Sequence, residues 1–358
     1  AVGRLGGDEF AGVVRDAADM ARVEKLAQSI IDALSAPYEI DQHVLWIGAS
    51  IGVATSPRDG QSAETLIRSA DLALYRAKDA GGGVFRCYEP QLHVDAEERR
   101  VLEIALRQAL DRNELSLHYQ PVVEAGSGRL TGFEALLRWQ NPQFGNIPPA
   151  KFIPLAEAAR LIEPIGEWVL RTACAEAASW PSDARIAVNV SPDQLHNPNF
   201  VTVVAQALAN AGLPPHRLEL EVTENAFVRE GSSAVTVLEQ VIGLGVHLSL
   251  DDFGTGYSAL GYLSRTRFSS IKIDQTFVQG ASRGMPEALA IIRAVVALAG
   301  SLGISTTAEG VETEAELNLI RELGCSKIQG LYFGRPLPVE EARALIRRAR
   351  RPDASAAA

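Results

Sequence analysis

The sequence has few cysteines and no long uninterrupted apolar run. Three cysteines occur in 358 residues, and Cys87, Cys174 and Cys325 form no CxxC pair. This small odd number excludes a disulfide framework and favours reduced thiols in a cytoplasmic protein. The longest apolar stretch, residues 288–304, contains Arg293 near its middle, which is typical of an amphipathic helix and not of a membrane span.

Positive charge is also in short supply, with 34 Lys plus Arg against 44 Asp plus Glu and a formal net charge of −10. An acidic surface disfavours nonspecific binding to a nucleic-acid polymer. The length of 358 residues is enough for two or three domains. Because the sequence starts at Ala1 without a signal-peptide pattern, we expect the downstream part of a longer protein, located in the cytoplasm or, if an upstream anchor exists, at the cytoplasmic face of a membrane.

From residue 117 onward, short β-branched or apolar runs alternate with longer helical patterns. This alternation is typical of βα units, and eight such strands favour a closed α/β barrel. The expected strands are residues 117–123, 130–137, 185–190, 217–222, 247–250, 270–273, 305–308 and 326–332. The expected helices are residues 163–179, 200–210, 232–244, 286–302, 314–323 and 339–350.

The region before the barrel contains fewer elements than a complete mixed α/β domain needs. A strand, a helix, a strand and a helix are expected there, at residues 10–14, 21–34, 45–54 and 63–79. A further helix is expected over 95–113, where Leu102, Leu106 and Leu110 recur at four-residue spacing opposite a charged face. This helix is predicted to link two modules or to cap the barrel.

Charged residues gather where the expected barrel strands end. In a parallel barrel the carboxyl ends of the strands meet at one mouth, where functional charges collect. Lys272, Arg138 and the amide of Asn189 fall at these ends. Five carboxylates are predicted to converge at the same mouth: Glu134, Glu221, Asp251, Asp252 and Glu309.

Carboxylates a few ångströms apart raise one another's pKa, so such a cluster takes up protons or binds cations. Carboxylate and amide oxygens without histidine or cysteine suit Mg²⁺ or Mn²⁺ better than Zn²⁺. If Asp251 or Asp252 bridges, two ions about 3.5 to 4 Å apart could support in-line phosphoryl displacement. Taken singly, each acid is better explained as a helix cap or a surface charge, but that interpretation does not account for all five positions.

Residues 133–139 read FEALLRW and resemble the signature of the EAL phosphodiesterase domain. Further motifs extend the resemblance over residues 113–350, namely YQPVV, FIPLAE, GEWVL, NVSP, LELEVTE, DDFGTGYSAL, IKID, AEGVET and QGLYFGRPLP. The EAL family hydrolyses the bacterial second messenger cyclic di-GMP to the linear dinucleotide pGpG. The resemblance therefore implies a metal-dependent phosphodiesterase on a TIM-like (β/α)8 barrel whose first strand runs antiparallel.

The resemblance also implies roles for the acidic residues. Asp251 would be shared between two ions, with Asp252 serving the second, and Lys272 would orient the attacking water or a metal-bound oxygen. Glu309 would act as a general base or support the second ion, and both roles remain open. The implied ligands of the first ion are Glu134, Asn189, Glu221 and Asp251, and the implied catalytic residues are Glu134, Lys272 and Glu309.

Other residues of the expected site would contact substrate or hold a loop. The resemblance implies that Arg138 binds a substrate phosphate, where a guanidinium suits the oxygens. It implies that Glu224 anchors the glycine-containing loop at 252–258 and that Gln120 and Gln329 form walls of the site.

The first part of the chain resembles the second half of the GGDEF diguanylate cyclase domain. The resemblance implies that the GGDEF turn lies against a guanosine nucleotide, with its glutamate near a metal. The upstream half of that family, with its phosphate loop, has no counterpart in this sequence, so we expect no cyclase activity. The motifs that carry the resemblance are SIGVA, ADLALYRAK and the turn itself, Gly6, Gly7, Asp8, Glu9 and Phe10.

The sequence leaves two other functions open. One is a receptor that binds cyclic di-GMP without hydrolysis and signals through the 95–113 helix, and the other is a barrel that serves only in dimerisation. We favour the enzyme because no expected ligand is missing. The resemblance also allows a homodimer, and GTP as a ligand of a complete GGDEF module. The expected boundaries are 1–89 for the GGDEF half-domain, 90–113 for the linker, 114–350 for the barrel and 351–358 for a tail.

Overall fold

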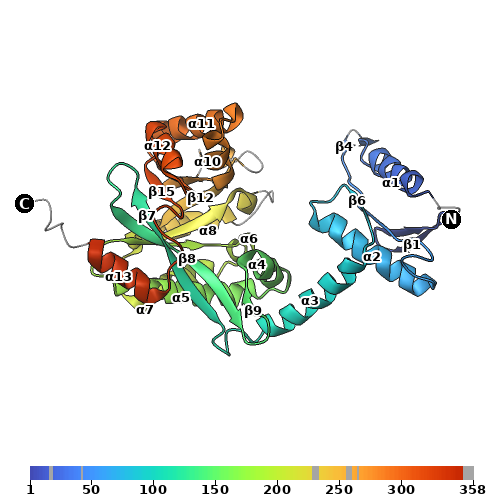
Figure 1. The fold of residues 1–358 in the computed structure, drawn as a ribbon, viewed down its shortest axis with the longest axis horizontal. Coiled ribbons are helices and arrows are strands. Elements are labelled where there is room, and N and C mark those ends of the chain that lie inside the picture. Colours follow the sequence, from blue (N-terminus) through green and yellow to red (C-terminus); the bar gives the residue numbers. More distant parts are fainter. Residues whose placement is uncertain (16–18, 42, 228–233, 255–259, 264–265, 350–358) are drawn as a thin grey trace, which may run out of the picture. The chain divides into compact units, whose positions relative to one another are not determined.

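The computed structural model describes residues 1–15, 19–41, 43–227, 234–254, 260–263 and 266–349. The chain divides into two compact units, Ala1–Leu102 and Glu103–Ala358 (Figure 1). Helix α3 (Pro90–Leu106) carries the chain from the first unit into the second.

Within its described residues the first unit contains three separate two-stranded sheets. Strands β1 and β2 pair antiparallel, as do β3 and β4, whereas β5 and β6 pair in parallel. Helix α2 packs against β5 so closely that a Cβ atom on Gly52 would overlap the backbone of Ala70. The bounds are β1 (Val2–Gly6), β2 (Glu9–Gly12), α1 (Met20–Leu34), β3 (Tyr38–Ile40), β4 (His43–Leu45), β5 (Ile51–Val53), α2 (Ala63–Asp79) and β6 (Phe85–Cys87).

The second unit is a closed eight-stranded barrel, which confirms the expected fold. The order is β10, β11, β12, β13, β14, β15, β7 and β8, and a further pairing between β10 and β8 closes it. Strand β7 runs antiparallel to both neighbours, and β9 forms a short hairpin with β8. The bounds are β7 (Leu115–Glu124), β8 (Leu130–Asn141), β9 (Gly145–Ile147), β10 (Arg185–Asn189), β11 (Leu218–Thr223), β12 (His247–Phe253), β13 (Ser270–Ile273), β14 (Ser305–Ala308) and β15 (Lys327–Gln329).

Helices connect the barrel strands. Figure 1 shows α10, α11 and α12 grouped together, and α5 beside α7 elsewhere around the barrel. The bounds are α4 (Pro149–Ala158), α5 (Ile162–Ala178), α6 (Pro192–Leu195), α7 (Phe200–Ala211), η1 (Pro215–Arg217), η2 (Glu224–Phe227), α8 (Ala234–Gly243), α9 (Leu260–Leu263), α10 (Gln275–Ser282), α11 (Pro286–Leu302), α12 (Glu314–Glu322) and α13 (Val339–Ala349). No helix in the described part of the chain combines the length and apolar character needed to cross a bilayer.

Side chains alternate along the barrel strands, so that polar ones point into the barrel and apolar ones pack against the surrounding helices. Tyr119 and Phe133 both contact Trp180, which follows α5 outside the barrel. Side chains alternate between the two faces of a strand, so the neighbours Gln120 and Glu134 point inward. Polar residues therefore reach the barrel mouth on strands whose other face is held by aromatic packing.

Two elements expected before the barrel are wrong in their bounds. The helix expected over 95–113 begins at Pro90 and ends at Leu106, and residues 107–113 form turns that finish with Asn113 at φ 55°. Leucine spacing continues through Leu110, but after Leu106 the backbone hydrogen bonds change to the i→i+3 type, from Gln108 N–H to Ala105 and from Ala109 N–H to Leu106. The strand expected over 45–54 is divided between β4 and β5, with irregular backbone between them.

The last expected strand, 326–332, is shorter in the structure and ends at Gln329. A Cβ atom on Gly330 would overlap the backbone of Val311, so the chain turns where only glycine fits. Helix α4, which contains Pro154, was not among the expected helices, and the short β9 and α10 were not expected either.

Helix α4 ends with an arginine in the left-handed conformation. Arg160 has φ 56°, and its N–H donates to the Glu157 carbonyl while Leu161 N–H donates to that of Ala156. These are the two hydrogen bonds of a Schellman motif, in which the left-handed position favours glycine.

We expect Arg160→Gly to raise the free energy of unfolding of the barrel by about 0.5 to 1 kcal/mol, because it relieves the Cβ strain of a left-handed residue. Three of the four tryptophans (Trp139, Trp168 and Trp180) lie in the barrel, so fluorescence during urea denaturation reports on it. Asn113→Gly is the matched control and should stabilise less, since asparagine tolerates this conformation better. An unchanged or lower midpoint for Arg160→Gly would show that the arginine is not strained.

Candidate active site

The parallel register brings the predicted site residues to one mouth of the barrel. Asn189 pairs with Glu221 across β10 and β11, and Thr223 pairs with Asp251 across β11 and β12. Glu134 on β8 pairs with Ala187 on β10, two residues before Asn189. Residues far apart in the sequence therefore share the carboxyl ends of neighbouring strands, as the sequence predicts.

Lys272 is the buried cation that these carboxylates surround. Its side chain is 3% exposed, and Nζ lies 2.8 Å from Glu221 Oε2, 3.2 Å from Asp251 Oδ1, 2.7 Å from Glu309 Oε1 and 3.8 Å from Glu134 Oε2. Burial acts to lower the lysine pKa, but the four carboxylates outweigh it and raise the pKa well above its usual value. Lys272 therefore stays charged and neutralises part of the cluster.

One positive charge cannot keep all of these acids ionised. Burial raises the pKa of Glu309 to about 8. The charge of Lys272 acts to lower this pKa, and the charges of Asp251 and Glu134 act to raise it. Burial also raises the pKa of Glu221 well above its usual value, with Glu134 and Asp251 acting in the same direction. Without a further cation, the site holds protons near neutral pH.

Glu134 differs from its neighbour Glu221. Burial acts to raise its pKa, but Lys272 and hydrogen bonds from Gln329 and Asn189 lower it below the usual value. Asn189 Nδ2 donates to Glu134 Oε1 at 2.6 Å, and Gln329 Nε2 donates to Glu134 Oε2 at 2.5 Å. Glu134 is therefore the more acidic of the two carboxyl groups.

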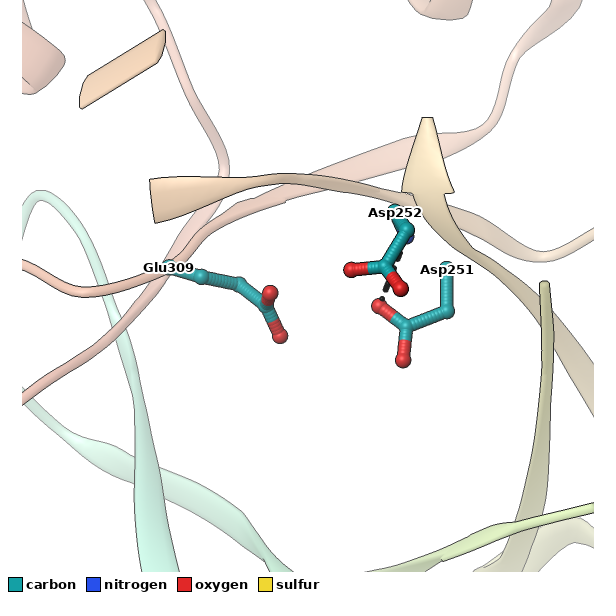
Figure 2. Close-up of side chains that lie close together, drawn as sticks. All are labelled: Asp251, Asp252 and Glu309. Atoms are coloured by element: carbon teal, nitrogen blue, oxygen red, sulfur yellow. Dashed lines mark hydrogen bonds between the residues drawn. The ribbon is translucent and has the colours of Figure 1, made fainter. Parts of the chain in front are cut away.

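A second group of acids lies beside the first. Figure 2 shows Glu309 pointing toward Asp251 and Asp252, and oxygen atoms from the three carboxylates lie within 4.8 Å of one another. Asp252 N–H donates to Asp251 Oδ1 at 2.9 Å, and Asp252 has φ 54°. Burial and the charge of Asp251 raise the pKa of Asp252. A divalent cation would relieve this repulsion.

The oxygen donors of the site fit a hard divalent cation, and Asp251, Asp252 and Glu309 are close enough to share one. Asn189 uses its amide nitrogen toward Glu134, which leaves Oδ1 as the atom able to coordinate an ion. Asp251 contacts Lys272 and also belongs to the group with Asp252 and Glu309, so it connects the two sets. Oxygen ligands alone favour Mg²⁺, Mn²⁺ or Ca²⁺ over Zn²⁺.

Gln329 forms hydrogen bonds with both Gln120 and Glu134. Gln329 Nε2 donates to Gln120 Oε1 at 3.1 Å as well as to Glu134, and Gln329 is 4% exposed. Gln329 Oε1 is buried and has no hydrogen-bond partner in the described part of the chain. The two glutamines therefore position Glu134 and leave one acceptor open.

Arg138 lies on β8, four residues after Glu134 and on the same face. Its side chain is half-buried, and burial lowers its pKa. The guanidinium donates to the neighbouring Leu137 carbonyl at 2.9 Å, and no ion pair links it to a carboxylate among residues that the structure describes. The remaining guanidinium donors can bind an anion.

Glu224 contacts the start of the predicted loop. Its Oε1 accepts a hydrogen bond from Gly254 N–H at 3.1 Å. Residues 255–258 of the 252–258 loop lie outside the described residues. The GGDEF turn lies elsewhere, in the β1–β2 hairpin, where Gly7 has φ 52° and Arg4 donates to its carbonyl.

One residue near the site was not singled out from the sequence. His118 lies two residues before Gln120 on β7, opposite Leu136. The two-residue period of the strand would have placed it on the inner face with Gln120.

We expect Mg²⁺ at several times its dissociation constant to raise the melting temperature of the metal-free chain by about 2 to 4 °C. The rise should be larger at about pH 8.5 than at about pH 6, because below a pKa of about 8 the ion must displace the proton of Glu309. Asp251→Asn should reduce the rise, whereas Glu312→Gln, an exposed acid in the following loop, should not. A rise that does not depend on pH would show that the ion does not displace a proton from Glu309.

Comparisons with known proteins agree with this geometry. The model of the diguanylate cyclase, GGDEF domain, matches residues 1–83. The bifunctional diguanylate cyclase/cyclic di-GMP phosphodiesterase MucR of Pseudomonas aeruginosa is 44% identical over 344 residues, which cover 95% of this chain and 50% of MucR. The cyclic di-GMP phosphodiesterase PdeR of Escherichia coli is 36% identical over 338 residues, which cover 94% of this chain and 51% of PdeR. This chain spans about half the length of these relatives.

A solved structure of the PaMucR phosphodiesterase in complex with c-di-GMP superposes with a TM-score of 0.64 at 46% identity, covering 66% of this chain and 97% of that one. The model of the EAL domain matches residues 103–336, well over half of the sequence. The chain therefore belongs to the EAL domain family and begins with a region similar to the GGDEF domain.

Proposed function

We propose that the barrel hydrolyses cyclic di-GMP to pGpG with the help of divalent cations. The observation that carries the proposal is the mouth at which Lys272 partly neutralises four carboxylates while Arg138 remains open to an anion. The phosphodiesterases MucR and PdeR are similar over nearly the whole chain. A phosphodiester is an anion, so its attack by water needs such added positive charge.

The residues present would hold two ions. Asn189 and Asp251 would bind the first with the carboxylates of Glu134 and Glu221, and Asp251 would share the second with Asp252 and Glu309. When bound, the ions would lower the pKa of a water molecule and neutralise charge on the phosphate. Mg²⁺ and Mn²⁺ both suit these ligands.

The chain's own groups would do the remaining work. Arg138 would bind a phosphate oxygen, and Lys272 would keep the carboxylates in place and orient the attacking water. Glu309 would accept the proton of that water or support the second ion. Water would add to phosphorus as the bond to the 3′ oxygen breaks, and that oxygen would take a proton from solvent. This gives a linear product with a 5′ phosphate.

The first unit is proposed to have no cyclase activity in this chain. The GGDEF turn lies on the β1–β2 hairpin, which pairs with no other strand in the described part of the unit. Its residue Phe10 is 64% exposed. The boundaries at 89, 113 and 350, a homodimer, and GTP at a complete GGDEF module stay predictions.

We expect the purified chain with Mg²⁺ or Mn²⁺ to convert cyclic di-GMP to pGpG, measured by chromatography of the nucleotides. Glu134→Gln should lower kcat by about a hundredfold or more, since losing a ligand costs more than losing a partner of a ligand. Glu219→Gln is the matched control, because Glu219 is a buried carboxylate of the same strand as Glu221 but accepts from Ser270 instead of Lys272.

Three outcomes of that assay can be told apart. Cyclic di-GMP that is bound but remains intact would favour a receptor. Equal turnover by the Glu134→Gln variant would remove the proposed site. Neither binding nor turnover by the unaltered chain would contradict the proposed substrate.

We expect no cyclic di-GMP after incubation of the chain with GTP and Mg²⁺, because the isolated hairpin cannot position two nucleotides. The assay is best made with Glu134→Gln, in which hydrolysis of any product is suppressed. Accumulation of cyclic di-GMP in that variant would contradict the prediction.

A further inference from the structure

Strand β7 places a histidine next to the predicted phosphate contact. In the register of β7 and β8, His118 is opposite Leu136, while Arg138 is opposite Ser116 and Glu134 is opposite Gln120. Neighbours on one face of an antiparallel pair, including diagonal ones, lie within reach of long side chains. His118 therefore lies between the levels of Glu134 and Arg138.

The direction of the His118 side chain follows from its neighbours on the strand. Tyr119 points outward onto Trp180, so His118 points to the opposite face, as does Gln120. Gln120 accepts a hydrogen bond from Gln329 at the site. The imidazole is half-buried, so solvent and a ligand can still reach it.

The charges of Arg138 and Glu341 act on His118, and the charge of Glu134 acts on Arg138. Burial and the charge of Arg138 lower the pKa of His118, whereas a hydrogen bond to the Pro336 carbonyl and the charge of Glu341 on α13 act in the opposite direction. Arg138 has no carboxylate partner among the described residues, as shown above. An anion on Arg138 would remove the main charge that opposes protonation of His118.

We propose that His118 is a second substrate-binding residue, which takes up a proton from solvent and donates a hydrogen bond to the phosphodiester that Arg138 holds. This inference rests on the proposed function, since cyclic di-GMP supplies the anion. No covalent bond changes, and the imidazole becomes an imidazolium as the complex forms. Substrate binding is therefore coupled to proton uptake.

The sign of the coupling follows from the two states. In the free chain the pKa of His118 lies below the usual value of 6.5, and the bound anion raises it. Affinity for cyclic di-GMP is unaffected by His118 above the bound-state pKa, increases as pH falls between the two pKa values, and levels off below the free-state pKa.

The test compares binding of cyclic di-GMP by calorimetry at about pH 8 and about pH 5.5, in EDTA so that no turnover occurs. The increase in affinity of the unaltered chain should exceed that of His118→Gln, by a factor that approaches about threefold for a shift of half a pKa unit. His247→Gln is the matched control. His247 is also half-buried with a lowered pKa, but it begins β12 at the other end of the barrel.

A measurement on the unaltered chain does not depend on the folding of a variant. The pKa values of the six histidines can be followed by NMR of the ring Cε1 signals with and without cyclic di-GMP. One histidine, absent from the His118→Gln spectrum, should titrate at least half a unit higher in the complex, and that of His247 should not move. If none of the six rises, the proposal is wrong whether or not the variant folds.

The two proposals fail in different ways. If the unaltered chain neither binds cyclic di-GMP nor hydrolyses it with Mg²⁺ or Mn²⁺, the substrate is wrong and the role of His118 falls with it. If the chain binds and hydrolyses cyclic di-GMP but His118→Gln keeps the full pH dependence, the proposed function stands and the role of His118 is wrong.

Discussion

The ion pairs of Lys272 are the interaction on which the site depends. One buried ammonium contacts carboxylates from four separate strands or strand ends. Removing one partner of a buried ion pair leaves an uncompensated charge, which is strongly destabilising. Lys272 therefore stabilises the arrangement of these carboxylates. Its single positive charge does not keep all of them ionised. The remaining repulsion is what prepares the site for a divalent cation.

Carboxylates at the two ends of the barrel differ in how far neighbouring groups neutralise them. At the end opposite the site, Glu219 accepts a hydrogen bond from Ser270 at 2.5 Å and lies 3.7 Å from Arg185. That carboxylate is satisfied within the chain. At the site end, Asp251, Asp252 and Glu309 crowd together, and the pKa of Glu309 rises to about 8. The site cluster therefore differs from Glu219 in that its negative charge is only partly neutralised.

Much of the fold could be predicted because local patterns carry it. Strands 270–273 and 305–308 and helix 286–302 have the expected bounds, since apolar periodicity and glycine or proline boundaries define them. The bounds expected for the 95–113 helix were wrong because leucine spacing continues into the turns that follow Leu106. Helix α4 was hidden by Pro154, whose cost is outweighed by tertiary packing of Phe152 and Leu155.

The sequence by itself determined which chemical groups are available: acids, one amide and one lysine at the ends of predicted strands, and therefore an oxygen-ligand site. Only the tertiary structure decided which of these groups lie close enough to change one another's pKa. It placed Glu309 with Asp251 and Asp252, lowered the pKa of Glu134 while raising that of Glu221, and brought His118 within reach of the charge of Arg138. The physical reason is that pKa values and ion affinity depend on distance and burial, which closure of the barrel imposes on residues far apart in the chain.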